Sequence, residues 1–141
     1  MNRAVYINRI AAYLPGEPID NDRMESVLGV IGGRPSRARA IVLRSNGIKT
    51  RYYAIDPATG EPSMNNAQLT AAAIRRLEGA GFTLDRIQCL ACGTSSPDQL
   101  LPGHAVMVHG ELGSPTCEVA SPSGICISGV IALKYGYMAV L

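Results

Sequence analysis

The last stretch of the chain, Thr116 to Leu141, constrains the fold more than any other part of this 141-residue sequence. It begins with a short apolar run at Cys117–Ala120, which predicts a buried strand. Ser121–Gly124 follows with the proline and glycine of a turn. From Cys126 onward, apolar side chains recur at helical spacing. The sequence therefore predicts a buried helix that begins at a cysteine, directly after a strand-to-helix turn.

The position of Cys126 allows two interpretations. The free N–H groups and the dipole of a helix N-terminus favour thiolate over thiol, and a thiolate can attack a thioester to give an acyl-enzyme. Nearby N–H groups can then hold the oxyanion. However, a free cysteine usually behaves as a small buried apolar side chain that fills a helix–sheet contact. Spacing alone favours neither interpretation.

Strands and helices are expected to alternate along the rest of the chain. The expected elements are a strand at Val5–Ala12, helices at Asp20–Leu28, Arg37–Arg44, Asn65–Ala80 and His104–Leu112, strands at Ile87–Cys92 and Cys117–Ala120, and the final buried helix. This order is typical of an α/β domain around a mostly parallel sheet. In such sheets functional side chains gather beyond the carboxyl ends of the strands, which is where Cys126 falls.

The sequence also predicts how three of these helices are capped and oriented. Asp22 and Glu25 are spaced as a capping box for the first helix. In the helix His104–Leu112, Val106 and Leu112 are expected to point inward. The inward face of the helix Asn65–Ala80 is expected to consist of Leu69, Ala73, Leu77 and Ala80.

Composition excludes several classes of protein. A net charge of +2 is too small to indicate a nucleic-acid partner or an anionic membrane surface. The final apolar helix, from Ile125, carries Lys134 and falls short of the ~20 residues that a bilayer requires, so we expect no membrane association. Asn8 and Arg9 interrupt the only early apolar run, so we expect no signal peptide and a cytoplasmic location.

The four cysteines are expected to be free thiols, because nothing in the sequence indicates secretion. Cys89 and Cys92 form a C-x-x-C pair on a predicted strand, where residues three apart point to opposite faces. No second pair and no suitably spaced histidines complete a zinc site, so we expect no metal. We interpret Cys89, Cys92 and Cys117 as core residues.

The run S-G-I-C-I-S-G-V-I-A-L-K-Y around Cys126 resembles the active-site segment of thiolase-fold condensing enzymes, above all β-ketoacyl-acyl-carrier-protein synthase III and its ketosynthase III-like relatives. Tyr13-Leu14-Pro15 and the segment from Arg44 to Lys49 resemble further motifs of that family, in the same order. Ser128 stands where the commonest synthases have glycine, whereas thiolases and several synthase III-like branches carry C-x-S-G. The resemblance implies a thiolase-like half with a mostly parallel sheet, a buried central helix and Cys126 as nucleophile.

The resemblance also implies roles for two other residues. Arg44 would line the mouth of the pantetheine tunnel and contact the phosphate of coenzyme A or of an acyl carrier protein, which suits guanidinium geometry. Leu101 would approach the acyl pocket of the partner subunit in a homodimer. Ala40 occupies a position where synthases with acyl-CoA starters often carry tryptophan, so an acyl carrier protein is an alternative donor. No permanently bound cofactor is implied.

In this family the catalytic His and Asn come from the second of two similar halves. His104 and His109 precede the cysteine and match neither, so we expect residues 1–141 to be the amino-terminal half, with the carboxyl-terminal half absent. The implied function is that of a 3-oxoacyl-ACP synthase III-type acyltransferase in fatty-acid or polyketide-like biosynthesis. It would load an acyl group on Cys126 for decarboxylative condensation with a malonyl thioester, a step this chain alone is expected to lack.

Two alternatives stay open at this point. The first is a non-catalytic truncated fragment, or a subunit of a split enzyme that acts only in dimerisation while another chain supplies the second half. The second and weaker alternative is a cysteine hydrolase, which would need a histidine base.

Overall fold

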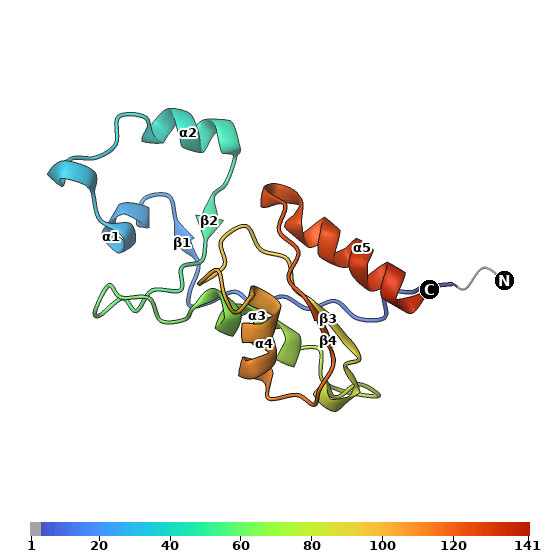
Figure 1. Ribbon diagram of the computed structural model, residues 1–141. Helices are drawn as coiled ribbons and strands as arrows, with labels where there is room; N and C mark the ends of the chain where they lie inside the picture. Colours follow the sequence, from blue (N-terminus) through green and yellow to red (C-terminus); the bar gives the residue numbers. More distant parts are fainter. Residues whose placement is uncertain (1–3) are drawn as a thin grey trace. The chain divides into compact units, whose positions relative to one another are not determined.

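The structure is a computed structural model that describes residues 4–141, without the side chain of Ile31. The chain folds as two compact units (Figure 1): a smaller unit, Leu14–Met64, and a larger unit that joins the segment up to Tyr13 with Asn65–Leu141. The elements in chain order are β1 (Ile19–Asp20), α1 (Met24–Leu28), a 3₁₀ turn (Ile31–Gly33), α2 (Arg39–Asn46), β2 (Thr50–Arg51), α3 (Asn66–Arg75), a 3₁₀ turn (Leu84–Arg86), β3 (Cys89–Ala91), α4 (His104–Leu112), β4 (Glu118–Ala120), a 3₁₀ turn (Ile125–Ile127) and α5 (Ser128–Val140).

The larger unit has the predicted α/β character. Strands β3 and β4 are parallel, with Leu90 opposite Val119, as the strand–helix–strand order indicated. Helices α3 and α4 pack on each other, α4 packs on both strands, and α5 packs against β3. The core between them consists of Ala67, Ala71, Leu90, Cys92, Ala105, Val108 and Leu112. Its three alanines are fully buried, which allows the helices to approach closely.

The smaller unit contains α1, α2 and the antiparallel pair β1–β2, in which Ile19 lies opposite Arg51. The predicted capping box of Asp22 and Glu25 is wrong, because α1 starts later, at Met24, and has no side-chain cap. Asp20 instead accepts hydrogen bonds through Oδ1 from the backbone N–H groups of Asp22 (3.0 Å) and Arg23 (2.8 Å). This local side-chain turn competes with the first helical turn and delays the helix.

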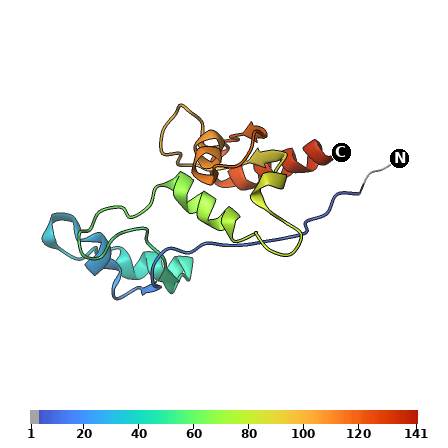
Figure 2. The ribbon, with the colours of Figure 1, turned by 90° about the horizontal axis from the view of Figure 1, so that it is seen from below.

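The predicted first strand, Val5–Ala12, is also wrong. The segment runs extended along the larger unit (Figure 2) but pairs with no strand among residues 4–141. Arginine side chains hold it: Arg9 donates to the carbonyl oxygen of Leu77 (3.1 Å), and Arg76 donates to that of Ala12 (2.7 Å). An apolar run becomes a strand only where a neighbouring strand pairs with it through backbone hydrogen bonds.

The positions of the helices along the chain were predicted better than the residues that they bury. The α3 side chains that are fully buried are those of Ala67 and Ala71, while Leu69 is only half-buried and Ala80 is exposed. In α4 the expectation for Leu112 is confirmed, but Val106 is 44% exposed. The predicted face included two alanines, Ala73 and Ala80, but the alanines that allow α3 and α4 to pack closely are Ala67 and Ala71.

Helix α5 is not the buried central helix that the sequence predicted. Only Ser128 among its residues is buried, and Val130, Leu133 and Tyr137 are each more than half exposed. The helix packs against β3, and its exposed residues Val130, Leu133 and Tyr137 line an open groove together with residues 5–7. No helix within residues 4–141 is long and apolar enough to cross a membrane.

Candidate active site

Cys126 lies in the turn between β4 and α5. After Ala120 the chain passes through Ser121–Gly124 and the 3₁₀ turn Ile125–Ile127 before α5 begins at Ser128. The cysteine therefore precedes Ile127, the N-cap residue of α5, by one position, and its side chain is exposed. The sulfur belongs to the turn rather than to the helix, and it is open to solvent.

The backbone of this turn is strained next to the cysteine. Ile125 has φ of 54°, the single positive value for a non-glycine residue in the described part of the chain. A β-branched residue in this region is a genuine outlier and costs on the order of 1–3 kcal/mol. The Ile125 side chain is 76% exposed, so burial does not offset this cost. The surrounding contacts must therefore impose the conformation.

Ser128 supplies those contacts. Its hydroxyl donates to the carbonyl oxygen of Ile125 (2.8 Å) and accepts from the backbone N–H of Gly124 (2.9 Å). The side chain is only 3% exposed, which makes both hydrogen bonds hard to replace by water. The N–H of Ile127 donates to the carbonyl oxygen of Gly124 (3.1 Å), and that of Ser128 donates to Ile125. These two amides are thus not available as oxyanion donors.

Gly93 fixes the start of α5 against the end of β3. A Cβ atom at this position would lie 2.2 Å from the carbonyl oxygen of Ser128 and 2.5 Å from its carbonyl carbon. Only glycine therefore lets the first turn of α5 approach this closely. One residue before Gly93, the backbone N–H of Cys92 donates to the carbonyl oxygen of Ala120 (3.0 Å), which connects the ends of β3 and β4. Our sequence reasoning missed Gly93, although a glycine directly after a strand is a signal of close backbone approach.

The other three cysteines lie in different surroundings. Burial raises the pKa of the Cys92 thiol to about 11, and the neighbouring Cys117 and Cys89 add to this shift. Burial also raises the pKa of Cys89, with Glu118 and then Cys117 contributing. Cys92 is buried, as predicted for a core residue, whereas Cys89 and Cys117 are half-buried. All four cysteines are free, and Cys126 is the exposed one.

His104 is buried at the start of α4 and joins that helix to α3. Its Nε2 lies 3.1 Å from the Thr70 hydroxyl, which donates its own hydrogen to the carbonyl oxygen of Asn66 (2.9 Å). Nε2 is therefore the protonated nitrogen, and Nδ1 is an acceptor without a partner in the described part of the chain. Burial lowers the pKa of His104, and the Asp98 carboxylate opposes this only in part. His104 faces a cavity of about 210 Å³ that Ser121 also lines but Cys126 does not.

The other predicted site residues are both exposed. Arg44 lies in the last turn of α2, in the smaller unit, whereas Cys126 belongs to the larger unit. Leu101 is 86% exposed in the loop between β3 and α4, and its carbonyl oxygen accepts from the side-chain amide of Gln99 (3.0 Å). Within residues 4–141, no three His, Cys, Asp or Glu side chains are grouped so that they could hold a metal ion.

No protein-family model matches the chain. Its fold is similar to that of a solved structure, AbyA1, a tetronic acid condensing enzyme, with a TM-score of 0.73 and 29% sequence identity. The match covers 92% of this chain and 39% of that one. The chain therefore has the fold of part of a thiolase-like condensing enzyme.

Within that class, the curated relatives are β-ketoacyl-acyl-carrier-protein synthases III. The protein of that name from Granulibacter bethesdensis is 32% identical over 137 residues, and the one from Xanthomonas axonopodis pv. citri is 27% identical over 137 residues. The matches cover 96% and 95% of this chain, which spans 38% of the length of each relative. The resemblance to the amino-terminal half of a synthase III, predicted from the segment around Cys126, is confirmed.

Proposed function

We propose that this chain provides the acyl-accepting part of a 3-oxoacyl-ACP synthase III-type acyltransferase, with Cys126 as the nucleophile. The observation that carries the proposal is the exposed sulfur in a strained turn between β4 and α5, held by the buried Ser128. Strained backbone persists where the surrounding structure imposes it, and it gathers at functional sites. The names of the relatives support the same reaction class.

The proposed step is a thioester exchange. The Cys126 thiolate attacks the carbonyl carbon of an acyl thioester, the bond between that carbon and the donor sulfur breaks, and the donor leaves as a thiol with the proton that Cys126 gave up. The donor is acyl-CoA or acyl-ACP, bound through its phosphopantetheine, and no permanently bound cofactor takes part. Arg44 contacts the donor phosphate. Leu101 approaches the acyl pocket of the second subunit of a homodimer.

The later condensation needs further groups. Decarboxylation of a malonyl thioester develops an enolate, which requires positioned hydrogen-bond donors. Neither His104, which is held between α3 and α4, nor the half-buried His109 has a contact with Cys126 among its hydrogen bonds. We therefore propose that residues from a further segment or a second chain complete the condensation, in cytoplasmic fatty-acid or polyketide-like biosynthesis.

A second candidate function is favoured by one observation. Helix α5 exposes Val130, Leu133, Tyr137 and Met138, and the first three of these line an open apolar groove of about 810 Å³. Apolar surface of this kind is typical of an interface. A non-catalytic role in dimerisation, or in completing a split enzyme, would use this face and would not need Cys126.

Acylation of the intact chain separates the two functions. Incubation with acetyl-CoA or with an acetylated carrier protein should add one acetyl group, seen by intact-protein mass spectrometry. Cys126→Ala should abolish the adduct, whereas the matched variant Cys117→Ala should retain it. Equal labelling of wild type and Cys126→Ala, or none in either, would leave only the non-catalytic role.

A further inference from the structure

Helix α4 is capped by a side chain from another element. Its own N-cap residue is Gly103, which has no side chain to accept a hydrogen bond from the first turn. The backbone N–H of Ala105, in that turn, donates instead to the hydroxyl oxygen of Ser121 (2.8 Å). Ala105 is fully buried, so its N–H depends on this hydroxyl for a partner. Ser121 therefore supplies the cap that the N-cap residue lacks.

The backbone of Gly103 lies close to Ser121. A Cβ atom at position 103 would lie 2.9 Å from the Oγ of Ser121 and 3.2 Å from its Cβ. The φ of Gly103 is −64°, a value that other residues also adopt. Close approach of Ser121, and not backbone conformation, is thus what favours glycine at this position. The glycine and the serine are complementary.

Ser121 also begins the segment that leads to Cys126. It directly follows β4, and the residue itself is exposed, so the hydroxyl contact and not burial attaches it to α4. At the other end of the segment, the Ser128 hydroxyl accepts from the N–H of Gly124 and donates to the carbonyl oxygen of Ile125. Two serine hydroxyls therefore hold the turn, one at α4 and one at α5.

We infer that Ser121 is a positioning residue for Cys126, which it influences through the turn. The inference rests on the proposed function, acyl transfer to Cys126. A strained residue such as Ile125 keeps its conformation only where the surrounding contacts impose it. Ser128 fixes the end of the turn, whereas Ser121 fixes its start. Without the Ser121 contact the turn relaxes, and a shift of about 1 Å in a reacting group can slow a reaction about 10²-fold.

The rate at which the intact chain acylates Cys126 tests this inference. Mass spectrometry over a range of acetyl-CoA concentrations separates the maximal rate from the half-saturating concentration. Ser121→Ala should lower the maximal rate about tenfold and change the half-saturating concentration less than about twofold, because the reacting geometry changes and the contacts with the donor do not. Ser121→Thr, which keeps a hydroxyl, should restore most of the rate.

Two further measurements separate positioning from a loss of stability. Alkylation of Cys126 by iodoacetamide needs an accessible thiol but no aligned acyl donor, so Ser121→Ala should be alkylated within about twofold of the wild-type rate. Gly103→Ala disturbs the same contact from the other side, by placing a Cβ atom against the Ser121 Oγ, and should also slow acylation. The double variant should be no slower than Ser121→Ala, since both changes act on one contact.

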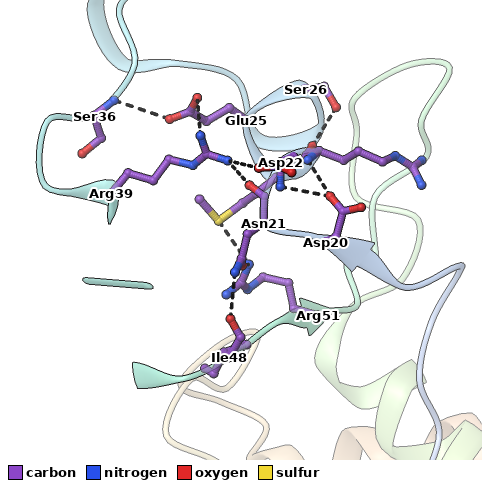
Figure 3. A network of polar contacts seen from close by, with 11 residues as sticks. Asp20, Asn21, Asp22, Glu25, Ser26, Ser36, Arg39, Ile48 and Arg51 are labelled. Carbon is purple, nitrogen blue, oxygen red and sulfur yellow. Dashed lines mark hydrogen bonds and ion pairs between the residues drawn. The ribbon is translucent and has the colours of Figure 1, made fainter. Parts of the chain in front are cut away.

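Asn65→Ala is the matched control in the larger unit. Asn65 caps α3 by accepting from the N–H of Gln68 (2.8 Å), so this variant loses a helix cap as Ser121→Ala does, but at α3 rather than at α4. Asp20→Ala is the corresponding control in the smaller unit, where Asp20 accepts from two backbone N–H groups just before α1 (Figure 3). Both controls should keep the maximal rate within about twofold of the wild type.

The inference is wrong if Ser121→Ala is acylated as fast as the wild type, or if Asn65→Ala is slowed by the same factor. Equal slowing of acylation and alkylation in Ser121→Ala would also contradict it, because the thiol itself and not its alignment would then have changed. If the wild-type chain accepts no acetyl group at Cys126, the proposed acyltransferase function fails and this inference fails with it. Acylation of the wild type that does not respond to Ser121→Ala leaves the proposed function standing and overturns the inference alone.

Discussion

Ile125 adopts a backbone conformation that its side chain disfavours, and the residue that follows it is Cys126. The strain is maintained by Ser128, whose buried hydroxyl bridges Gly124 and Ile125. Since the Ile125 side chain is mostly exposed, its shape contributes little packing. The hydrogen bonds of the turn therefore impose the positive φ at position 125. A residue that accepts positive φ should remove the strain there.

Ile125→Gly should therefore leave the stability unchanged or raise it by up to about 1 kcal/mol, because relief of strain offsets the greater freedom of glycine in the unfolded chain. Ile127→Gly is the matched control. Ile127 has φ of −102°, so the same substitution should lower stability by roughly 0.5–1 kcal/mol. Urea unfolding measures both values. An equal loss in the two variants would show that the Ile125 backbone is not strained.

His104 should make stability depend on pH. Burial lowers its pKa in the folded state below the unfolded value of about 6.5, so the unfolded chain takes up the proton first as the pH falls. The free energy of unfolding should be constant above that value and decrease as the pH falls below it. His104→Gln should remove this part of the pH dependence, whereas His109→Gln should retain it. Identical profiles for the wild type and His104→Gln would contradict the assignment.

At the scale of single residues, the sequence predicted Cys126 as the nucleophile but missed the residues that hold its turn in place. The C-x-S-G pattern indicated a nucleophile, while Ser128 was read only as a difference between family branches. Its structural role depends on a hydrogen bond to the carbonyl oxygen of Ile125. The spacing of apolar residues in the sequence does not predict the geometry of this turn. Gly93 was missed for a similar reason. The position must be glycine because the backbone of α5, a distant part of the chain, lies against it.

At the scale of elements, the end of β3 and the start of α5 are joined by a contact that tolerates no side chain. Gly93→Ala would place a Cβ atom against the backbone of Ser128, which cannot move as a flexible side chain can. The variant should lose about 1–3 kcal/mol, as expected for overpacking. Gly136→Ala in the middle of α5 meets no atom within 4 Å and should gain up to about 1 kcal/mol from helix propensity.

Thermal unfolding followed by circular dichroism would measure both glycine variants. If Gly93→Ala were as stable as Gly136→Ala, the close approach of β3 and α5 would be wrong. A loss confined to Gly93→Ala, accompanied by weaker acylation of Cys126, would connect this contact to the geometry of the turn.

Element positions were predictable because local signals set them. The helix at His104–Leu112 and the parallel pairing of the last two strands follow from spacing and from the glycine after the helix, Gly113, which caps it with φ of 62°. Pairing and burial were not predictable in the same way. Residues 5–12 and α5 both have apolar patterns, but whether such a pattern is buried depends on which other elements cover it.

At the scale of the whole molecule, Cys126 is exposed, whereas burial raises the pKa of the Cys89 and Cys92 thiols. The chain spans 38% of the length of its curated relatives, and the apolar face of α5 is open in this structure. We propose that the folded turn, and not merely the presence of a thiol, makes Cys126 an acyl acceptor.

The most direct test compares acyl transfer to Cys126 in the folded chain and in the urea-unfolded chain, with acetyl-CoA at the same pH. Peptide mass spectrometry would read the adduct at Cys126 and at the other cysteines. We predict that Cys126 is acylated at least about tenfold faster in the folded chain, because an activated nucleophile depends on its surroundings. An equal rate in the two states, or a faster rate in the unfolded chain, would contradict the claim.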